Sequence, residues 1–231
     1  LLTLGGRYDY NKIRVTGGYG SVFNPRVAVV VTPGKFVFKS IYASAFQNAS
    51  NWTKYGTTTS RRANNPTLKP EKVSNIDLSV AYRFSKDIYA DIVYYNSSFK
   101  NTAEIGKTIY EGSPTTQQKA IGKLKIYGIQ SNFTAKLNAY SIYANFTYTN
   151  PKKAIVDDGE ITNDYIRLGD IASVRLNSGI NTTYFNKLGL NLGMNLIGNR
   201  PVGPGTSVAD NLEEFPTVAL FNSTFTYLNP F

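Results

Sequence analysis

Hydrophobic and polar residues alternate with a period of two along much of this chain. The clearest stretch runs from Val73 to Phe84. One parity carries mostly large apolar side chains and the other mostly polar or small ones: Ile76, Leu78, Val80, Tyr82 and Phe84 against Asn75, Asp77, Ser79, Ala81 and Arg83. Because successive side chains of a strand point to opposite faces, the pattern predicts a β-strand with one apolar face.

A second stretch, Ala139 to Thr149, adds a gradient along the apolar face. Tyr140 lies at one end and Tyr148 at the other, with aliphatic residues such as Ile142 between them. Tyr and Phe favour the two interfaces of a bilayer, while aliphatic side chains favour its hydrocarbon centre. This order is typical of a strand that faces lipid.

Eight further segments follow the same rhythm, which gives ten predicted strands. They are Leu1 to Tyr10, Phe23 to Thr32, Phe36 to Phe46, Asp87 to Phe99, Lys123 to Leu137, Asp170 to Phe185, Leu188 to Gly198 and Phe215 to Leu228. Most are longer than the usual strand of a globular protein.

Short and long connections alternate between these strands. The short ones are Thr32 to Lys35, Ser85 to Asp87, Lys136 to Asn138 and Phe185 to Lys187, and the long ones are Gln47 to Lys72, Lys100 to Gly122, Asn150 to Gly169 and Asn199 to Glu214. Up-and-down barrels of the bacterial outer membrane have short periplasmic turns and long extracellular loops. The expected fold class is therefore all-β, a transmembrane antiparallel up-and-down barrel. A soluble β-sandwich with a solvated outer face is the alternative.

Composition supports a membrane location without a transmembrane helix. Aromatic residues make up 13% of the chain and charged residues only 17%, against about a quarter charged in soluble domains. The longest apolar run, Val27 to Val31, is too short to cross a bilayer as a helix.

Two segments resemble TonB-dependent outer-membrane receptors. They are FNPRVAVVVTPGKFVFKSIYASAFQNAS (Phe23 to Ser50) and NPTLKPEKVSNIDLSVAYRF (Asn65 to Phe84). In that family, an "NPR" strand, a short turn and a "Y..AF..PS"-like segment precede a long loop, and "L.PE" then opens a strand ending in "YRF". Ala49 stands where the family has the proline of "PS".

The resemblance implies that residues 1–231 are about 10 strands of a 22-stranded barrel, resembling its strands 11 to 20. The plug, the segment that contacts TonB and the final strands would then lie outside these residues. Unpaired edge strands in lipid also predict partner strands, because each orphaned backbone group costs several kcal/mol.

Several kinds of chemistry are absent from the sequence. There is no cysteine and no histidine, which removes thiolate metal sites and His-dependent hydrolysis. We expect no enzyme activity, no cofactor, no metal site and no catalytic residues. The net charge is +10, but the basic residues are scattered without a nucleic-acid-binding motif, so nucleic acid is not an expected partner.

Aromatic and basic residues in the expected extracellular loops are candidates for ligand contact, by stacking and by pairing with carboxylate or phosphate. They are Trp52, Tyr55, Arg61, Arg62, Tyr110, Tyr165 and Arg200. In the alternative interpretation, Trp52 anchors a strand end and the arginines face lipopolysaccharide phosphates. Asp157, Asp158 and Glu160 form an acidic cluster that lacks the spacing of a calcium loop; cation binding there stays open.

The predicted function is an outer-membrane receptor that takes up a scarce nutrient, such as a metal-siderophore, cobalamin or glycan, with TonB-coupled energy. Expected partners are outer-membrane lipids and lipopolysaccharide, the TonB complex through the plug segment, a nutrient ligand and a surface lipoprotein. The alternatives are a passive outer-membrane barrel and an extracellular β-rich binding or adhesion module.

Overall fold

The computed structural model describes residues 1–231 except 13–17, 57–61, 158–159, 185–186, 204–212 and 228–231. Its ten main strands are β1 (Leu2–Asn11), β2 (Gly20–Val31), β3 (Phe36–Gln47), β5 (Glu71–Arg83), β6 (Ile88–Tyr110), β7 (Ser113–Leu137), β8 (Tyr140–Asp157), β10 (Val174–Tyr184), β11 (Leu188–Ile197) and β14 (Val218–Tyr227). The minor elements are α1 (Asn51–Tyr55), β4 (Arg62–Ala63), β9 (Glu160–Arg167), β12 (Arg200–Pro201) and β13 (Glu214–Phe215).

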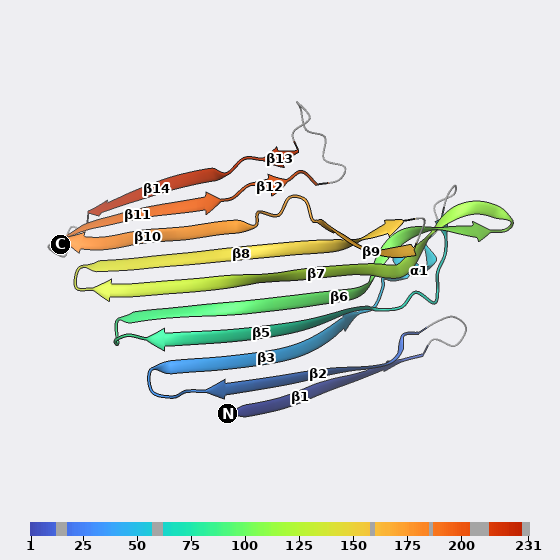
Figure 1. Ribbon diagram of the computed structural model, residues 1–231, viewed down its shortest axis with the longest axis horizontal. Coiled ribbons are helices and arrows are strands. Elements are labelled where there is room, and N and C mark those ends of the chain that lie inside the picture. Colours follow the sequence, from blue (N-terminus) through green and yellow to red (C-terminus); the bar gives the residue numbers. More distant parts are fainter. Residues whose placement is uncertain (13–17, 57–61, 158–159, 185–186, 204–212, 228–231) are drawn as a thin grey trace.

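The ten main strands pair in chain order, and each is antiparallel to the next. They form one curved sheet, with the short turns at one end and the long connections at the other (Figure 1). The predicted up-and-down architecture is confirmed. No second sheet covers the apolar face anywhere in the described part of the chain, so the β-sandwich alternative is wrong.

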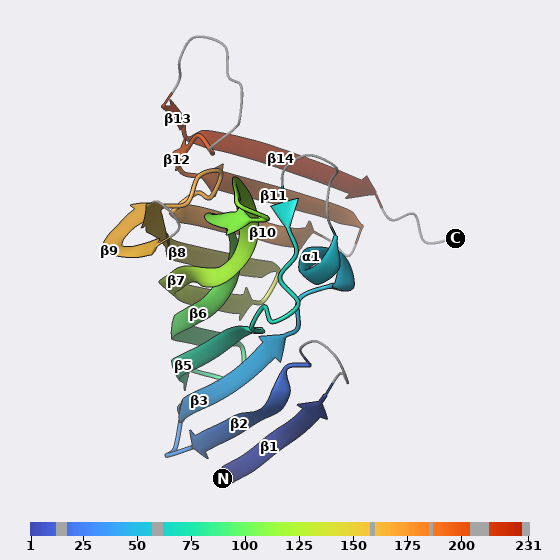
Figure 2. The same ribbon diagram turned by 90° about the vertical axis from the view of Figure 1, so that its right-hand side faces the viewer.

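The register places side chains of one kind on each face of the sheet. In one row across the strands, Val27 pairs with Tyr42, Tyr42 with Ile76, and Ile76 with Asn96. All four belong to the convex face, and their chain neighbours belong to the concave face. Seen from the long connections, the curvature is plain, and α1 lies on the concave side (Figure 2).

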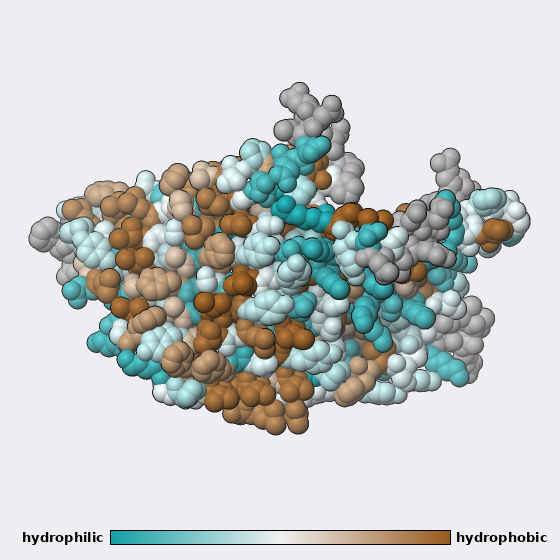
Figure 3. Space-filling view, viewed as in Figure 1, coloured by the Kyte–Doolittle hydropathy of each residue, from teal (hydrophilic) through white to brown (hydrophobic). Residues whose placement is uncertain are grey.

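The convex face exposes large apolar side chains over the part of the sheet nearer the short turns (Figure 3). Ile92 is 52% exposed, Leu78 47% and Leu192 44%. A soluble monomer rarely exposes an apolar surface of this extent, whereas a lipid-facing barrel wall requires one. Few apolar side chains are fully buried, and they are small or lie in the long connections, such as Ala135 and Leu68.

Two segments that the sequence analysis expects to be long loops are largely β-strand, so that prediction is wrong for them. The Lys100 to Gly122 segment continues β6 and β7 into a hairpin that turns at Glu111 and Gly112. Both turn residues have positive φ, 50° and 77°, as a two-residue hairpin turn with strand-matching twist requires. Much of the Asn150 to Gly169 segment is likewise strand, because β8 extends to Asp157 and β9 returns along it.

These extensions lack the alternation of apolar and polar residues because they lie beyond the lipid-facing part of the wall. Without lipid on one side, the segment has no need for a continuous apolar parity, and its strand propensity rests on β-branched residues such as Thr102, Thr108 and Thr115. No helix in the described residues has the length and apolar character needed to cross a bilayer.

Candidate ligand-facing surface and extracellular rim

A row of carboxylate and amide side chains crosses five strands on the concave face. Asp91, Asn132, Asn145, Asn177 and Asn195 lie directly opposite one another on β6, β7, β8, β10 and β11. We call these five residues the polar row. The Asn132 amide donates to Asp91 Oδ2 at 2.9 Å, Asn145 donates to Asn177 at 3.5 Å, and Asn177 donates to Asn195.

The polar row leaves hydrogen-bonding capacity for a ligand, for water or for another segment of protein. Each Asn side chain has two donor hydrogens and an acceptor oxygen, and the bonds within the row use only part of them. A second amide pair, Asn191 donating to Asn181, lies nearer the short turns. The concave face is thus a wet, hydrogen-bonding wall rather than a hydrophobic core.

Tyrosines fill the space above glycines on the same face. Tyr95 lies opposite Gly128, and its hydroxyl reaches Thr149 Oγ1 on the next strand at 2.6 Å. Tyr143 covers Gly179 in the same way. An aromatic ring that covers a strand glycine supplies the packing that the glycine, which has no side chain, cannot supply.

The connection between β3 and β5 folds over the concave side at its long-connection end (Figure 2). Ser50 caps α1, with its hydroxyl accepting from Thr53 N–H at 3.1 Å. The Asn65 amide donates to the Gln118 carbonyl at 2.8 Å, and Gln117 Nε2 donates to the Asn64 carbonyl at 2.7 Å. These bonds fasten the connection to the extended part of β7, beside the pairing of β4 with β7.

Charged groups stiffen the wall just below this connection. Lys153 Nζ lies 2.7 Å from Glu104 Oε1 and links β8 to the extended part of β6. Glu71 accepts the Ala103 N–H at 2.9 Å, where the register of β6 shifts and leaves that group without a regular partner. The acidic groups of this region are therefore engaged in the scaffold.

The structure places the candidate ligand residues at the same end of the sheet but does not gather them into one site. Trp52 and Tyr55 belong to α1, with the Trp52 side chain 65% exposed. Tyr110 lies at the tip of the β6–β7 hairpin and is 49% exposed. The backbone of Arg62 pairs with Thr116 in β7.

Two of the other candidate ligand residues contact neighbouring side chains of this chain, and the rest lie outside the residues that the structure describes. Tyr165 pairs with Ala154 on β8 and lies beside Lys125, whose Nζ is 5.1 Å from the ring centroid. The Arg200 guanidinium stacks 5.0 Å from the Phe215 ring. Arg61 and Asp158 lie outside the described residues, as do the side chains of Arg62, Asp157 and Glu160. No group of three or more possible metal-binding side chains occurs among the described residues.

Sequence reasoning found the polar parity but missed the polar row itself. The signal was present as asparagines at equivalent places in successive strands, yet only the register shows that they are opposite. It also missed the anchoring residues Asn65 and Gln117, for which the sequence offers no signal.

Comparison with known families identifies the chain. The model of the TonB-dependent receptor-like β-barrel matches residues 1–229, so this chain belongs to the TonB-dependent receptor β-barrel family. The family consists of outer-membrane transport receptors rather than enzymes, and its barrels lie in the outer membrane of Gram-negative bacteria. The comparison with curated proteins found no match.

Solved structures share the fold at low sequence identity. The ferric enterobactin receptor PfeA of Pseudomonas aeruginosa superimposes with a TM-score of 0.75 at 18% identity, over 98% of this chain and 35% of that one. The siderophore receptor PirA of Acinetobacter baumannii gives 0.71 at 16%, over 98% and 37%. The FrpB iron transporter of Neisseria meningitidis gives 0.68 at 11%, over 90% and 32%. This chain thus spans about a third of these receptors.

Proposed function

We propose that this chain is the wall of an outer-membrane receptor that takes up a scarce metal chelate, a ferric siderophore in particular. The observation that carries the proposal is the contrast between the two faces, with exposed apolar side chains on the convex face and the polar row on the concave one. Such a wall encloses a wet lumen within lipid. Membership of the family and the siderophore and iron receptors among the structural neighbours support the choice of substrate class.

The proposal includes further strands and a plug outside these residues. Within the described residues, β1 pairs only with β2, and β14 only with β11. Their free edges would each present a row of unpaired N–H and C=O groups to the bilayer, at several kcal/mol per group. Additional strands remove this cost by closing the barrel. A plug inside it would contact the polar row and couple uptake to TonB.

Ligand capture belongs to the rim on the concave side. Trp52 and Tyr110 are the exposed aromatic residues best placed to stack on a flat aromatic chelate, and Tyr55, Arg61 and Arg62 come from the same connection as Trp52. Tyr165 and Arg200 contribute less in this proposal, because each already contacts a neighbour of this chain.

Uptake of radioactive iron tests the proposal in a strain that lacks its own siderophore receptors and expresses the full-length protein. Uptake of at least one ferric siderophore should depend on both the receptor and the membrane proton gradient. Tyr110→Ala should lower uptake at a subsaturating siderophore concentration about tenfold, for a lost aromatic contact of about 1.4 kcal/mol, whereas Tyr165→Ala, an equal truncation on the convex face, should leave uptake unchanged. Uptake that survives loss of the proton gradient, or absence of uptake for every siderophore supplied, would contradict it.

A further inference from the structure

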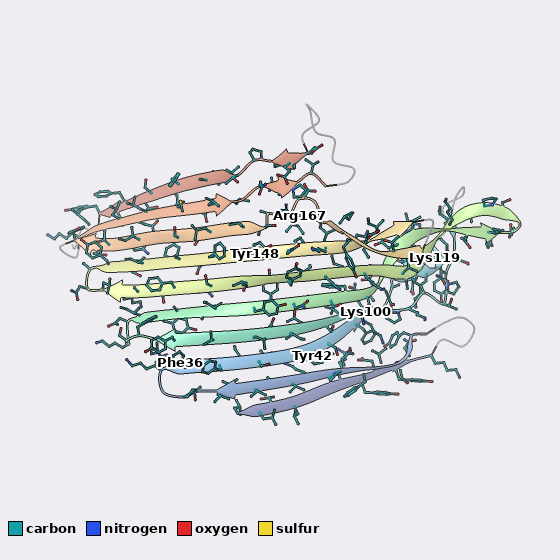
Figure 4. The ribbon with its side chains drawn as sticks, in the orientation of Figure 1. Phe36, Tyr42, Lys100, Lys119, Tyr148 and Arg167 are labelled. Atoms are coloured by element: carbon teal, nitrogen blue, oxygen red, sulfur yellow. The ribbon has the colours of Figure 1, made fainter. Side chains whose placement is uncertain are left out.

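Five lysines stand together on the convex face at its long-connection end. They are Lys72, Lys100, Lys123, Lys125 and Lys152. Lys72 pairs directly with Lys100, and Lys100 with Lys123, across β5, β6 and β7. Lys125 pairs with Lys152 one step nearer the apolar region. We call these five residues the lysine row; Figure 4 labels Lys100 within it.

No described carboxylate pairs with the lysine row, whose one ring contact is that of Lys125 Nζ with Tyr165, 5.1 Å from the centroid. Like charges directly opposite each other on neighbouring strands are destabilising, and this row contains three such pairs. Among the described outward positions of the ten strands, over the stretch of continuous register, there is no Asp or Glu. No salt bridge of a row lysine with a described residue is formed, and Lys72, Lys100, Lys123 and Lys125 are exposed.

Two cations next to the lysine row, Lys153 and Arg167, do form ion pairs with carboxylates of this chain. Lys153, adjacent to Lys152 but on the concave face, pairs with Glu104 at 2.7 Å. Arg167, which Figure 4 labels, is paired in register with Lys152, and its Nη1 lies 3.8 Å from Glu214 Oε1. The carboxylates of this region thus pair with other cations and not with a lysine of the row, which leaves the charge of the row for an external anion.

The position of the row specifies which anion. Tyr127 follows Lys125 by two residues on the same face of β7, and Ile129 follows next, so the lysines stand where the aromatic interface of the membrane begins. This end of the sheet carries the long connections, which face the cell exterior in outer-membrane barrels. An outer-leaflet lipid presents its headgroup phosphates at this height.

An apolar groove lies deeper on the same face. It is lined by Val29, Phe38, Ser40, Leu78, Ile92 and Tyr94, among others. Tyr94 precedes Lys100 by six positions on β6, which is roughly 20 Å along the strand, or about 15 Å of depth at the usual barrel tilt. That depth is about half the apolar thickness of the membrane, where acyl chains end.

We propose that the lysine row binds the phosphates of a phosphorylated, multiply acylated glycolipid of the outer leaflet, the lipid A part of lipopolysaccharide, with an acyl chain in the groove below. The lysine ammonium groups donate charge-assisted hydrogen bonds to the phosphate oxygens. Binding relieves the repulsion between the opposed lysines. The site lies on the outer wall, so it is separate from the nutrient path proposed above.

The test uses the full-length receptor, purified in detergent and titrated with bisphosphorylated lipid A, with lipid A stripped of both phosphates, and with inorganic phosphate, by native mass spectrometry. The variant carries Lys100→Gln, Lys123→Gln and Lys125→Gln. Its matched control carries Lys39→Gln, Lys86→Gln and Lys136→Gln, which remove the same charge from the concave face and a short turn. Heat-modified mobility on gels verifies that each barrel is folded.

Bisphosphorylated lipid A should bind the wild-type receptor and the control with equal affinity. Its affinity for the variant should be at least tenfold lower. Lipid A without its phosphates should bind the wild-type receptor with the same low affinity that bisphosphorylated lipid A has for the variant. Equal binding of intact lipid by wild type and variant would overturn the site. Displacement of the lipid by millimolar inorganic phosphate would overturn the lipid as its occupant. If the triple variant fails to fold, Lys123→Gln and Lys125→Gln, measured singly, apply the same criterion at a threefold loss.

Discussion

Tyr95 of β6 reaches across Gly128 of β7 to donate or accept a hydrogen bond with Thr149 of β8, at 2.6 Å between the two side-chain oxygens. One side chain therefore ties three strands together on the concave face. Gly128 makes this possible, since any larger residue would occupy the space of the ring. The packing of these three strands therefore depends on a glycine at position 128.

Gly128→Ala should therefore destabilise the barrel. A Cβ at this position would overlap the carbonyl oxygen of Tyr148 and lie 2.6 Å from the Tyr95 hydroxyl oxygen. Overpacking of this kind costs about 1–3 kcal/mol. Urea unfolding of the full-length receptor in lipid vesicles measures the loss. Gly5→Ala is the control, because no atom lies within 4 Å of its added Cβ; equal stability of the two variants would contradict the role of Gly128.

Asn132→Leu should weaken the polar row at the point where it meets a charge. Asn132 donates to the Asp91 carboxylate at 2.9 Å, and a hydrogen bond to a charged group contributes about 1.5–3 kcal/mol. We expect a loss at the lower end of that range, because water in the lumen can replace the amide. The same unfolding measurement applies. A variant as stable as the wild type would show that the row is not structural.

Asn65→Ala should loosen the connection that covers the lumen mouth. Its amide holds the Gln118 carbonyl at 2.8 Å, so its loss frees the connection from β7. Hydrogen exchange of α1 and β4 should become about fivefold faster, for a lost bond of about 1 kcal/mol. Asn64→Ala keeps the backbone carbonyl that accepts from Gln117 and should leave exchange unchanged. Identical exchange in both variants would contradict the anchoring role.

Ile92→Arg should be far more damaging than Val93→Arg. Ile92 faces outward in the apolar part of β6 and is 52% exposed, so its substitution places a charge against lipid at a cost of about 2–4 kcal/mol near the midplane. Val93 faces the lumen, where an arginine meets water and the Gln130 amide. The yield of heat-modifiable, folded barrel measures both variants. Equal yields would argue against lipid on the convex face.

The sequence predicted the ten strands because lipid on one side imposes a strict alternation, as in Val73 to Phe84. It failed where that constraint ends. The hairpin beyond Lys100 and the β9 strand have no lipid-facing parity, and α1 is too short to show helical periodicity. The sequence signal for α1 is Ser50, a residue type that caps helix N-termini, three positions before Thr53, whose N–H it accepts.

The candidate site was predicted less well than the fold. Trp52 and Tyr110 lie at the expected rim, but Tyr165 lies beside Lys125 and Arg200 stacks on Phe215. Loop residues meet through contacts distant in sequence, and no periodicity fixes those contacts. The lysine row was equally hidden, because its members are up to 80 positions apart (Lys72 to Lys152) and become neighbours only through the register.

In the proposed barrel, the convex face meets lipid and the concave face does not. A single cysteine is substituted in turn at each position from Tyr89 to Tyr94 of the full-length receptor, in outer-membrane lipids, and carries a nitroxide label; residues 1–231 contribute no competing cysteine. Collision with oxygen, which concentrates in the hydrocarbon, should be high at Ala90, Ile92 and Tyr94 and low at Tyr89, Asp91 and Val93. Collision rates that do not alternate, or that alternate in the opposite sense, would show that the convex face does not meet lipid.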